Sequence, residues 1–297
     1  MLAAGGIFAS NTSTLPISGL ARASAHPEKF IGLHFFSPVD RMELVEIIKG
    51  EKTSAETLAK AYDYVLQIGK TPIVVNDSRG FYTSRTFGTF VQEGCAMLAE
   101  GIPAAAIENA ARQAGMPVGP LEVIDQTSMS LSMHVMEQTI ADLKAEGKPL
   151  PPEHPGQKVI VKMVKELMRP GRAGGGGFYD YPKDGKKTLW PELARIFGKP
   201  GVKWDLQEMK DRILYRQSIE TARCLEEGVL STAHDANIGS IFGIGFPAWT
   251  GGALQYINHV GPAKFVARAD ELAKKYGERF APPKLLRDKA ARGEPLR

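Results

Sequence analysis

Cysteine is scarce in this chain, with two residues among 297. Two thiols are too few for a disulfide framework or a cysteine-rich metal cluster, so Cys95 and Cys224 are predicted to be buried and reduced, as in a cytoplasmic protein. Long apolar runs are also missing, since none approaches the roughly 20 residues that cross a bilayer. The first eight residues carry no basic stretch before an apolar core, so they are predicted to form a loop before a strand rather than a secretory signal.

The chain also lacks a large excess of charge of either sign. Its 37 basic and 33 acidic side chains give a net charge of +4, which gives no support to nucleic-acid binding. Hydrophobic residues make up 43% and charged residues 24%, the proportions of an ordinary globular protein without a membrane span. The length suffices for about two domains.

A parallel sheet is predicted for the first quarter of the chain. Short apolar runs bounded by turn residues are typical of strands buried on both faces, and they occupy residues 6–10, 30–36, 44–48 and 71–75. Between the last two runs, apolar residues recur at helical spacing, with a capping box at Thr53 and Glu56 and a stop at Gly69. This order indicates a parallel β-α-β unit.

Helices are predicted from residue 80 onward, and they contain an internal repeat. Residues 93–101 align with residues 220–228 at an offset of 127, and a Gly-x-Pro turn at Gly115 recurs at Gly245 at an offset of 130. Chance similarity of two amphipathic helices is the alternative. Two repeats are too few for a solenoid, which needs at least about three.

The predicted fold class is therefore α/β followed by all-α. It consists of a parallel sheet and two repeated helical units, and the family resemblance described below implies that the sheet is the C-terminal part of a Rossmann-type domain. The predicted domains are residues 1–78, residues 79–200 (the first helical unit with a linker rich in Pro and Gly) and residues 201–297 (the second helical unit).

Candidate functional residues follow the predicted strands, because ligands of open parallel sheets bind at the carboxyl ends of the strands. The first strand continues into residues 10–14, whose hydroxyl and amide groups suit the oxygen atoms of a ligand. The second contains His34, and imidazole is the usual general acid or base near neutral pH. Glu46 is a carboxylate in an apolar strand, able to orient that imidazole. The alternative for His34 is a core histidine satisfied by its neighbours.

No metal or phosphate site is predicted. The remaining histidines show no pair at zinc-ligand spacing. The glycine-rich run over residues 172–179 lacks the Gly-Lys-Ser/Thr ending of a phosphate-binding loop and follows no strand, so a flexible turn is favoured.

Several motifs carry a family resemblance that covers essentially the whole chain. They are FASNTS (8–13), GLHFFSPV (32–39), MELVEII (42–48), GFYTSR (80–85), PVGP (117–120) and GGFY (176–179). In this order they resemble the L-3-hydroxyacyl-CoA dehydrogenase family. The duplicated helical unit resembles the dehydrogenase half of the multifunctional fatty-acid oxidation complex α-subunit more than the shorter monofunctional enzyme.

The resemblance implies a role for each candidate residue. His34 matches the catalytic base that removes the proton of the 3-hydroxyl as C3 gives its hydride to NAD, and Glu46 matches the carboxylate that orients this base. Ser13 matches a serine that hydrogen-bonds the reacting oxygen. Ser84 stands where many relatives carry Asn, and a hydroxyl still donates a hydrogen bond there. Asn11 and Ser13 are the residues expected to contact the cofactor.

The resemblance also implies NAD as cofactor, an acyl-CoA substrate and a place in β-oxidation in the cytoplasm. The partners implied are a hydratase domain and a thiolase subunit of the full-length complex, or a second copy in a homodimer. A dinucleotide-binding domain opens with a strand, a Gly-x-Gly-x-x-Gly turn and a helix N-terminus. No such turn follows a strand here, so the family comparison predicts a domain truncated at its N-terminus.

Three functions stay open on this basis. The first is an NAD-dependent 3-hydroxyacyl-CoA dehydrogenase that uses a His–Glu pair. The second is a catalytically incompetent fragment that keeps the helical association surface but does not hold NAD. The third is a module that binds acyl-CoA without chemistry.

Overall fold

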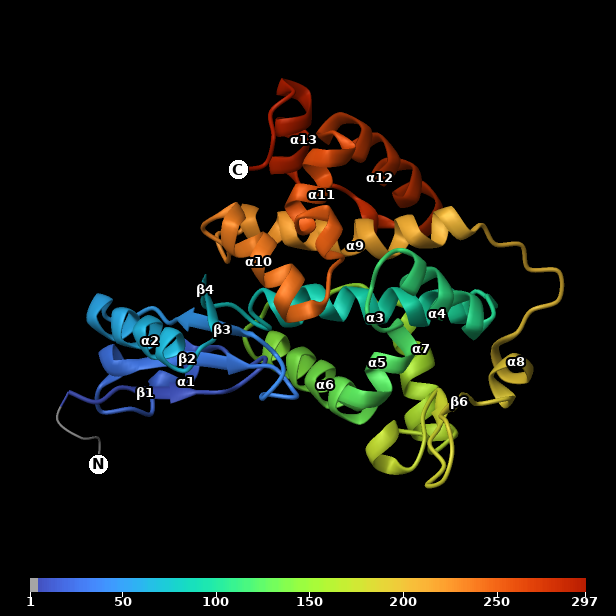
Figure 1. Cartoon of the computed structure of the whole chain (residues 1–297), viewed down its shortest axis with the longest axis horizontal. Coiled ribbons are helices and arrows are strands. Elements are labelled where there is room, and N and C mark those ends of the chain that lie inside the picture. The colour runs from blue at the N-terminus through green and yellow to red at the C-terminus, as the bar shows by residue number, and fades with distance from the viewer. Residues whose placement is uncertain (1–4) are drawn as a thin grey trace. The chain divides into compact units, whose positions relative to one another are not determined.

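The computed structural model describes residues 5–297, so the loop predicted at the very start of the chain lies partly outside the described residues. The chain forms two compact units: one combines the residues up to Phe87 with Leu214–Arg297, and the other is Gly88–Ile213. Two long helices, α3 (Thr83–Ala99) and α9 (Leu206–Glu226), contribute to both units (Figure 1). None of the described helices has the length and apolar character that a membrane-spanning segment requires.

The first unit contains a four-stranded sheet whose strands lie side by side in chain order. The strands are β1 (Phe8–Ser10), β2 (Phe30–Phe35), β3 (Leu44–Lys49) and β4 (Thr71–Asn76), each close to its predicted position. The predicted parallel sheet is in fact mixed: β1–β2 and β3–β4 are parallel, but β2–β3 is antiparallel. The connection between β2 and β3 is too short for the crossover of a dozen or more residues that parallel neighbours need.

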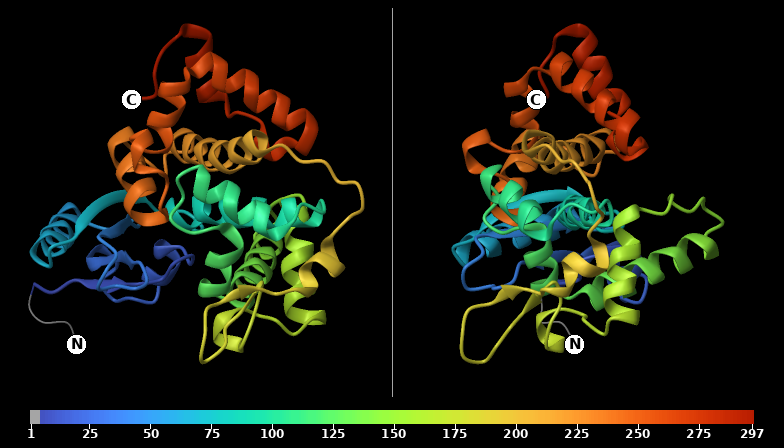
Figure 2. Two further views of the ribbon diagram at one scale, coloured as in Figure 1. Left: turned by 45° about the vertical axis from the view of Figure 1, so that its right-hand side comes forward. Right: turned by 90° about the vertical axis from the view of Figure 1, so that its right-hand side faces the viewer.

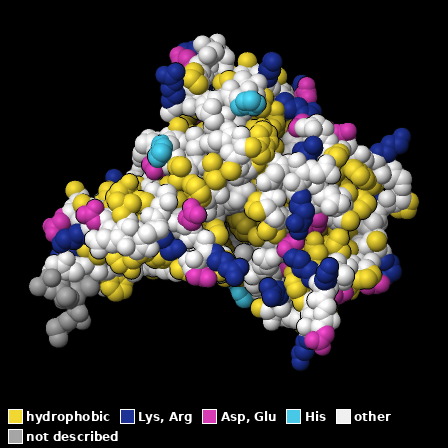
Figure 3. Space-filling view, viewed as in Figure 1, with side chains coloured by type: hydrophobic (Ala, Val, Ile, Leu, Met, Phe, Trp, Pro, Cys, Tyr) yellow, Lys and Arg dark blue, Asp and Glu magenta, His cyan; other side chains and the backbone are white. Residues whose placement is uncertain are grey.

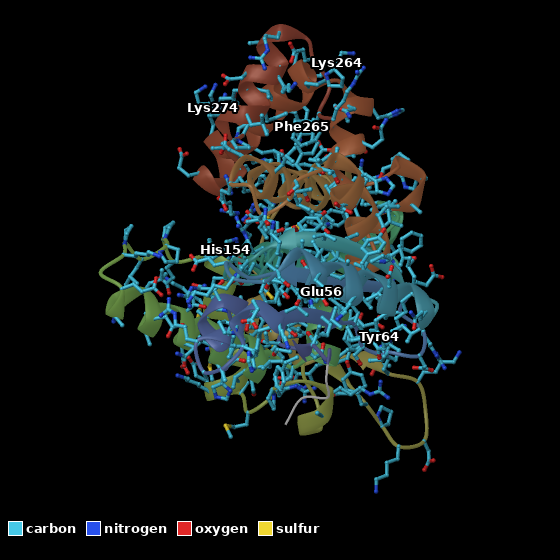
Figure 4. All side chains as sticks on the ribbon, turned by 90° about the vertical axis from the view of Figure 1, so that its left-hand side faces the viewer. Glu56, Tyr64, His154, Lys264, Phe265 and Lys274 are labelled. Atoms are coloured by element: carbon cyan, nitrogen blue, oxygen red, sulfur yellow. The ribbon has the colours of Figure 1, made fainter. Side chains whose placement is uncertain are left out.

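Helix α2 (Ala55–Gln67) covers one face of this sheet. It begins after Ser54, whose hydroxyl accepts a hydrogen bond from the backbone of Thr57, so the cap lies one residue beyond the predicted Thr53. Ala61 and Val65 of α2 pack on four strand residues, namely Ile31, Leu33, Val45 and Ile47. The outer side of α2 remains apolar through Tyr62, Tyr64, Leu66 and Ile68, over which yellow side chains gather in Figure 3 and of which Figure 4 labels Tyr64.

The opposite face of the sheet is covered by α1 (Ile17–Ala21) and by α10 (Ala233–Ile244). Both approaches depend on glycine. A Cβ atom at Gly32 would lie 2.8 Å from the Ile17 Cδ1, and a Cβ atom at Gly239 of α10 would lie 2.7 Å from the Ile73 Cδ1. Because glycine carries no side chain, helix and sheet come into direct contact at these positions.

The remaining helical part of the first unit has an aromatic core. Tyr215 of α9 stacks on Phe265 with ring centroids 4.0 Å apart, and Tyr256 meets both rings edge-on (Phe265 is labelled in Figure 4). These residues join α9 to the helices that follow α10, which are α11 (Ala253–Val260), α12 (Pro262–Tyr276) and α13 (Lys284–Arg292). Three 3-10 turns complete the unit: η1 (Pro27–Lys29), η4 (Ala248–Thr250) and η5 (Glu278–Phe280).

The second unit, Gly88–Ile213, is mainly helical, as predicted. Between α3 and α9 it contains α4 (Ala104–Gln113), α5 (Pro120–Thr127), α6 (Met129–Ala145), α7 (Pro155–Val161) and the π-helical turn η2 (Lys162–Glu166). The segment predicted as a linker holds η3 (Arg172–Gly174), a small hairpin of β5 (Tyr179–Asp180) and β6 (Thr188–Leu189), and α8 (Glu192–Phe197) (yellow in Figure 2). Gly101 and Gly115 end their helices with positive φ.

Replacing Gly239 tests the contact between α10 and the sheet. A Gly239→Val side chain would meet the Ile73 Cδ1 and the buried Tyr82 ring, whose Cε1 lies 2.9 Å from the added Cβ. We expect the free energy of unfolding to fall by about 1–3 kcal/mol because of this overpacking. The matched control is Gly19→Ala in α1, where no atom lies within 4 Å of the added Cβ. Denaturant unfolding compares the two variants, and equal stability of Gly239→Val and wild type would contradict the contact.

Candidate active site

His34 and Glu46 face each other across the antiparallel pair of strands. The register of β2 and β3 places these two residues directly opposite one another, and opposite residues project to the same face of the sheet. The His34 Nδ1 and the Glu46 Oε2 are 2.9 Å apart. The spacing of twelve residues in the sequence thus becomes a hydrogen bond because the two strands form a hairpin.

Glu46 is a fully buried carboxylate with four hydrogen bonds. Its Oε1 accepts from the backbone N–H groups of Tyr82 at 3.0 Å and Thr83 at 3.1 Å. Its Oε2 accepts from the Thr83 hydroxyl at 2.6 Å, in addition to the contact with His34. Glu46 has no exposed surface, and a buried charge of this kind is tolerated only when donors surround it.

The donors to Glu46 lie at the N-terminus of α3. The first N–H groups of a helix have no partner inside the helix, so they are free to bind an anion. The chain reaches this position through Gly80 and Phe81, which have φ values of 75° and 49°. A left-handed conformation is unfavourable for phenylalanine, and here it leads the chain directly into the two amides that hold Glu46.

The hydrogen bonds of Glu46 determine which nitrogen of His34 carries the proton. An ionised carboxylate has no hydrogen to donate and only accepts hydrogen bonds. The His34 Nδ1 therefore carries the hydrogen and donates it to the Glu46 Oε2. The His34 Nε2 is then an unprotonated acceptor in the neutral ring. Phe36 packs beside the imidazole with ring centroids 4.5 Å apart. This pair can accept a proton at Nε2 while the carboxylate stabilises the resulting cation.

The other predicted site residues lie at the ends of β1 and α3. The Asn11 Oδ1 accepts a hydrogen bond from the Phe35 backbone at 2.8 Å, which joins the ends of β1 and β2. The Ser84 hydroxyl donates to the backbone oxygen of Ser13 at 2.9 Å. Ser13 and Ser84, both predicted to bind substrate, are therefore in contact, while their roles stay predictions.

Two family models match consecutive parts of the chain. The NAD binding domain of 3-hydroxyacyl-CoA dehydrogenase matches residues 1–78, and the C-terminal domain of 3-hydroxyacyl-CoA dehydrogenase matches residues 80–181. Together these matches cover more than half of the chain. The chain belongs to the 3-hydroxyacyl-CoA dehydrogenase family. NAD is accordingly the cofactor of the domain type found at residues 1–78.

Similar proteins agree with this assignment. A fatty acid oxidation complex subunit alpha from Shewanella amazonensis is 38% identical over 97% of this chain, which spans 40% of the length of that relative. The dehydrogenase part of multifunctional enzyme 1 from C. elegans superposes with a TM-score of 0.64 at 25% identity, over 95% of this chain and 64% of that one. A 3-hydroxybutyryl-CoA dehydrogenase from Escherichia coli K12 shares the fold, with a TM-score of 0.74 at 22% identity, over 97% of this chain and 75% of that one.

The described residues of this family member fit one part of NAD better than the other. Asn11, Ser13 and His34 lie near the ends of β1 and β2, where a reacting nicotinamide and substrate would need polar groups. The pyrophosphate of a dinucleotide requires a glycine-rich turn at a helix N-terminus. Within residues 5–297 no Gly-x-Gly-x-x-Gly turn joins a strand to a helix, so the described residues do not fit the pyrophosphate.

Tyr82 and Thr83 are neighbours of Glu46 that the sequence pattern does not predict. Their amides hold Glu46 from 36 and 37 residues away in the chain. The available signal was a helix start after Gly80, which requires an acceptor for its first N–H groups. A buried carboxylate elsewhere in the sheet is one such acceptor.

The glycine-rich run of the second unit surrounds a buried acid, Asp125 of α5. Its carboxylate oxygens accept from the backbone N–H groups of Phe178 at 2.9 Å and Tyr179 at 2.8 Å. The Tyr181 hydroxyl donates a further bond at 3.1 Å. Any side chain at Gly177 would collide with the Asp125 carboxylate. The glycines therefore permit close approach of the backbone to Asp125.

Replacing Glu46 is expected to change the tautomer of His34. In Glu46→Gln the amide oxygen still accepts from the Tyr82 and Thr83 backbones, so the NH₂ group faces the His34 Nδ1 and the proton moves to Nε2. Long-range proton–nitrogen NMR spectra distinguish the Nδ1–H form expected in the wild type from the Nε2–H form expected in the variant. Glu43→Gln, at an exposed position just before β3, is the control. An unchanged Nδ1–H form in Glu46→Gln would contradict this geometry.

Asp125 predicts a pH dependence of stability in the second unit. Burial outweighs its hydrogen bonds and raises the pKa of Asp125 from 3.8 to about 6. The native state therefore binds this proton more tightly than the unfolded state, so the stabilisation is complete at about pH 4 and is lost as the pH rises through about 6. Between those limits the free energy of unfolding should fall by up to about 3 kcal/mol.

Denaturant unfolding of Asp125→Asn across this pH range provides the test. The variant should lack this part of the pH dependence, whereas Asp184→Asn at an exposed position of the β5–β6 hairpin should keep it. The same pH dependence in Asp125→Asn and in the wild type would show that other groups produce it.

Proposed function

We propose that this chain is an NAD-dependent 3-hydroxyacyl-CoA dehydrogenase of fatty-acid β-oxidation, which oxidises L-3-hydroxyacyl-CoA to 3-oxoacyl-CoA. The observation that carries the proposal is the 2.9 Å contact of His34 Nδ1 with the buried Glu46, which leaves Nε2 as the base. Family membership and the names of the relatives support the class of reaction that we propose.

In the proposed reaction the protein moves one proton. The His34 Nε2 takes the proton of the 3-hydroxyl as the C3–H bond breaks and the C3–O bond becomes a carbonyl. When bound, NAD supplies the hydride acceptor for the hydrogen of C3. Glu46 holds the ring and stabilises its positive charge. Ser13 and Ser84 would hydrogen-bond the reacting oxygen, and Asn11 with Ser13 would contact the cofactor.

The relatives suggest a wider setting for this activity. The name of the fatty acid oxidation complex subunit supports a multienzyme complex. We propose that this complex is cytoplasmic and that its partners are a hydratase domain and a thiolase subunit, with a homodimer as the alternative. We further propose that the chain consists of three domains, at residues 1–78, 79–200 and 201–297. The second helical domain then contributes to the same compact unit as the sheet.

A second candidate function is a fragment that keeps an acyl-CoA-binding surface but does not hold NAD. The observation in its favour is the sequence itself, in which no Gly-x-Gly-x-x-Gly turn follows a strand. Protection of residues 80–130 from hydrogen exchange by acyl-CoA, in the absence of NAD, would favour binding without chemistry.

Titration with NADH and the reduction of acetoacetyl-CoA decide between the two functions. For an active dehydrogenase, His34→Gln should lower kcat by a factor of about 10²–10⁴ through loss of the general base. His26→Gln, with a side chain 59% exposed in the same unit, should retain activity. NADH binding with turnover that depends on His34 excludes the fragment, and no binding at millimolar NADH supports it.

A further inference from the structure

Arg85, in the first turn of α3, lies between two carboxylates of the C-terminal helical segment. Its Nη2 donates to the Glu220 Oε1 at 2.7 Å, and its Nη1 donates to the Glu227 Oε2 at 2.6 Å. The Arg85 side chain is 19% exposed and that of Glu220 is 11% exposed. Although burial raises it, the pKa of Glu220 lies below its usual value because arginines surround the carboxyl. The contact is therefore between two charged groups.

Tyr82, three residues earlier, makes a second attachment to the same segment. Its hydroxyl donates to the backbone oxygen of Ala236 in α10 at 2.7 Å and lies 3.3 Å from the Thr221 hydroxyl in α9. Tyr82 has no exposed surface, and burial raises the pKa of its phenol. The hydroxyl consequently keeps its proton and its role as a donor.

The same short segment also holds the carboxylate of the candidate active site, Glu46. The backbone N–H groups of Tyr82 and Thr83 and the Thr83 hydroxyl all donate to Glu46. Ser84 donates to Ser13. One turn of helix, Tyr82–Arg85, thus contacts the carboxylate on one side and the helices α9 and α10 on the other.

We propose that Tyr82 and Arg85 are positioning residues, which fasten this turn to α9 and α10 and thereby fix Glu46 and the His34 ring that it orients. The end of β4 is attached to the same segment, since the Asn76 backbone donates to the Val229 oxygen at 2.9 Å. The catalytic meaning of this inference rests on the proposed function, but the positioning itself is measurable without turnover.

The sequence repeat supplies a matched control for Arg85. At the offset of 127, the residues Arg85, Glu220 and Glu227 correspond to Arg212, Glu93 and Glu100 with the repeats exchanged. The Arg212 Nε donates to the Glu93 Oε1 at 2.7 Å, and its Nη1 donates to the Glu100 Oε2 at 2.6 Å. This cluster lies in the other compact unit and includes none of the donors to Glu46. The reciprocal contacts also support the predicted duplication.

The experiment compares Arg85→Met with Arg212→Met. Both variants lose an Arg–Glu–Glu cluster, and because the Arg212 cluster is the more buried, Arg212→Met is the stricter control for a general effect on stability. In Arg85→Met, hydrogen exchange at the Tyr82 and Thr83 amides should accelerate about tenfold or more, and the Nδ1–H signal of His34 should weaken or disappear. In Arg212→Met both readouts should stay at wild-type values. Equal changes in the two variants, or none in Arg85→Met, would overturn the proposal.

A milder pair covers the case in which an arginine variant does not fold. Glu227→Gln and Glu100→Gln alter the more exposed carboxylate of each cluster, with side chains 48% and 34% exposed. Glu227→Gln should accelerate exchange at Tyr82 and Thr83, and Glu100→Gln should not. Arg85→Lys, which keeps a positive charge, should partly restore protection.

Activity provides a separate readout. If the wild type turns over, Arg85→Met should lower kcat more than it changes KM, and Arg212→Met should change neither. A wild type without NADH binding would refute the proposed dehydrogenase function, while hydrogen exchange and the His34 signal would still decide whether Arg85 positions Glu46.

Discussion

Burial of the Glu46 carboxylate in the middle of a sheet is unfavourable unless donors replace the lost water. In this protein the replacement comes from outside the sheet, through two amides and one hydroxyl at the start of α3. These hydrogen bonds hold the start of α3 against β3. Phe81, with its positive φ, directly precedes the first of these two amides.

The opposition of His34 and Glu46 depends on a loop length. A connection long enough for a helix would have made β2 and β3 parallel, and the register between them would then have been set elsewhere. The short connection produces an antiparallel pair in which residues 34 and 46 are neighbours on one face. Helix α10 covers that face and approaches it closely through its glycines, while α2 covers the other face. The imidazole thus lies in a layer that the C-terminal helices help to complete.

Local pattern was enough to predict the strands and the main helices and to mark His34 and Glu46 as candidates, whereas their roles as a pair came from the family resemblance. A carboxylate inside an apolar strand is conspicuous in any sequence, and glycine stops such as Gly101 and Gly115 adopt the positive φ that ends a helix. The other contacts that surround Glu46 and Asp125 could not be predicted in this way, because apart from His34 their donors lie between 36 and 56 residues away in the chain. The packing of α10 could not be predicted either, because its glycines contact strands that precede them by more than 150 residues in the chain.

The two arginine clusters show how one repeated contact acquires different consequences. Arg85 binds Glu220 and Glu227 at 2.7 and 2.6 Å, and Arg212 binds Glu93 and Glu100 at 2.7 and 2.6 Å. Arg212 is buried, and of the two glutamates that it binds, Glu93 lies on α3 and Glu100 directly follows that helix. Arg85 follows directly after the residues that hold Glu46, so the same interaction there constrains a buried carboxylate and, through it, an imidazole. The predicted duplication would account for both contacts. Only the cluster of Arg85 lies beside the sheet that carries Glu46, so a change in the second helical segment is expected to act on His34 without contacting it.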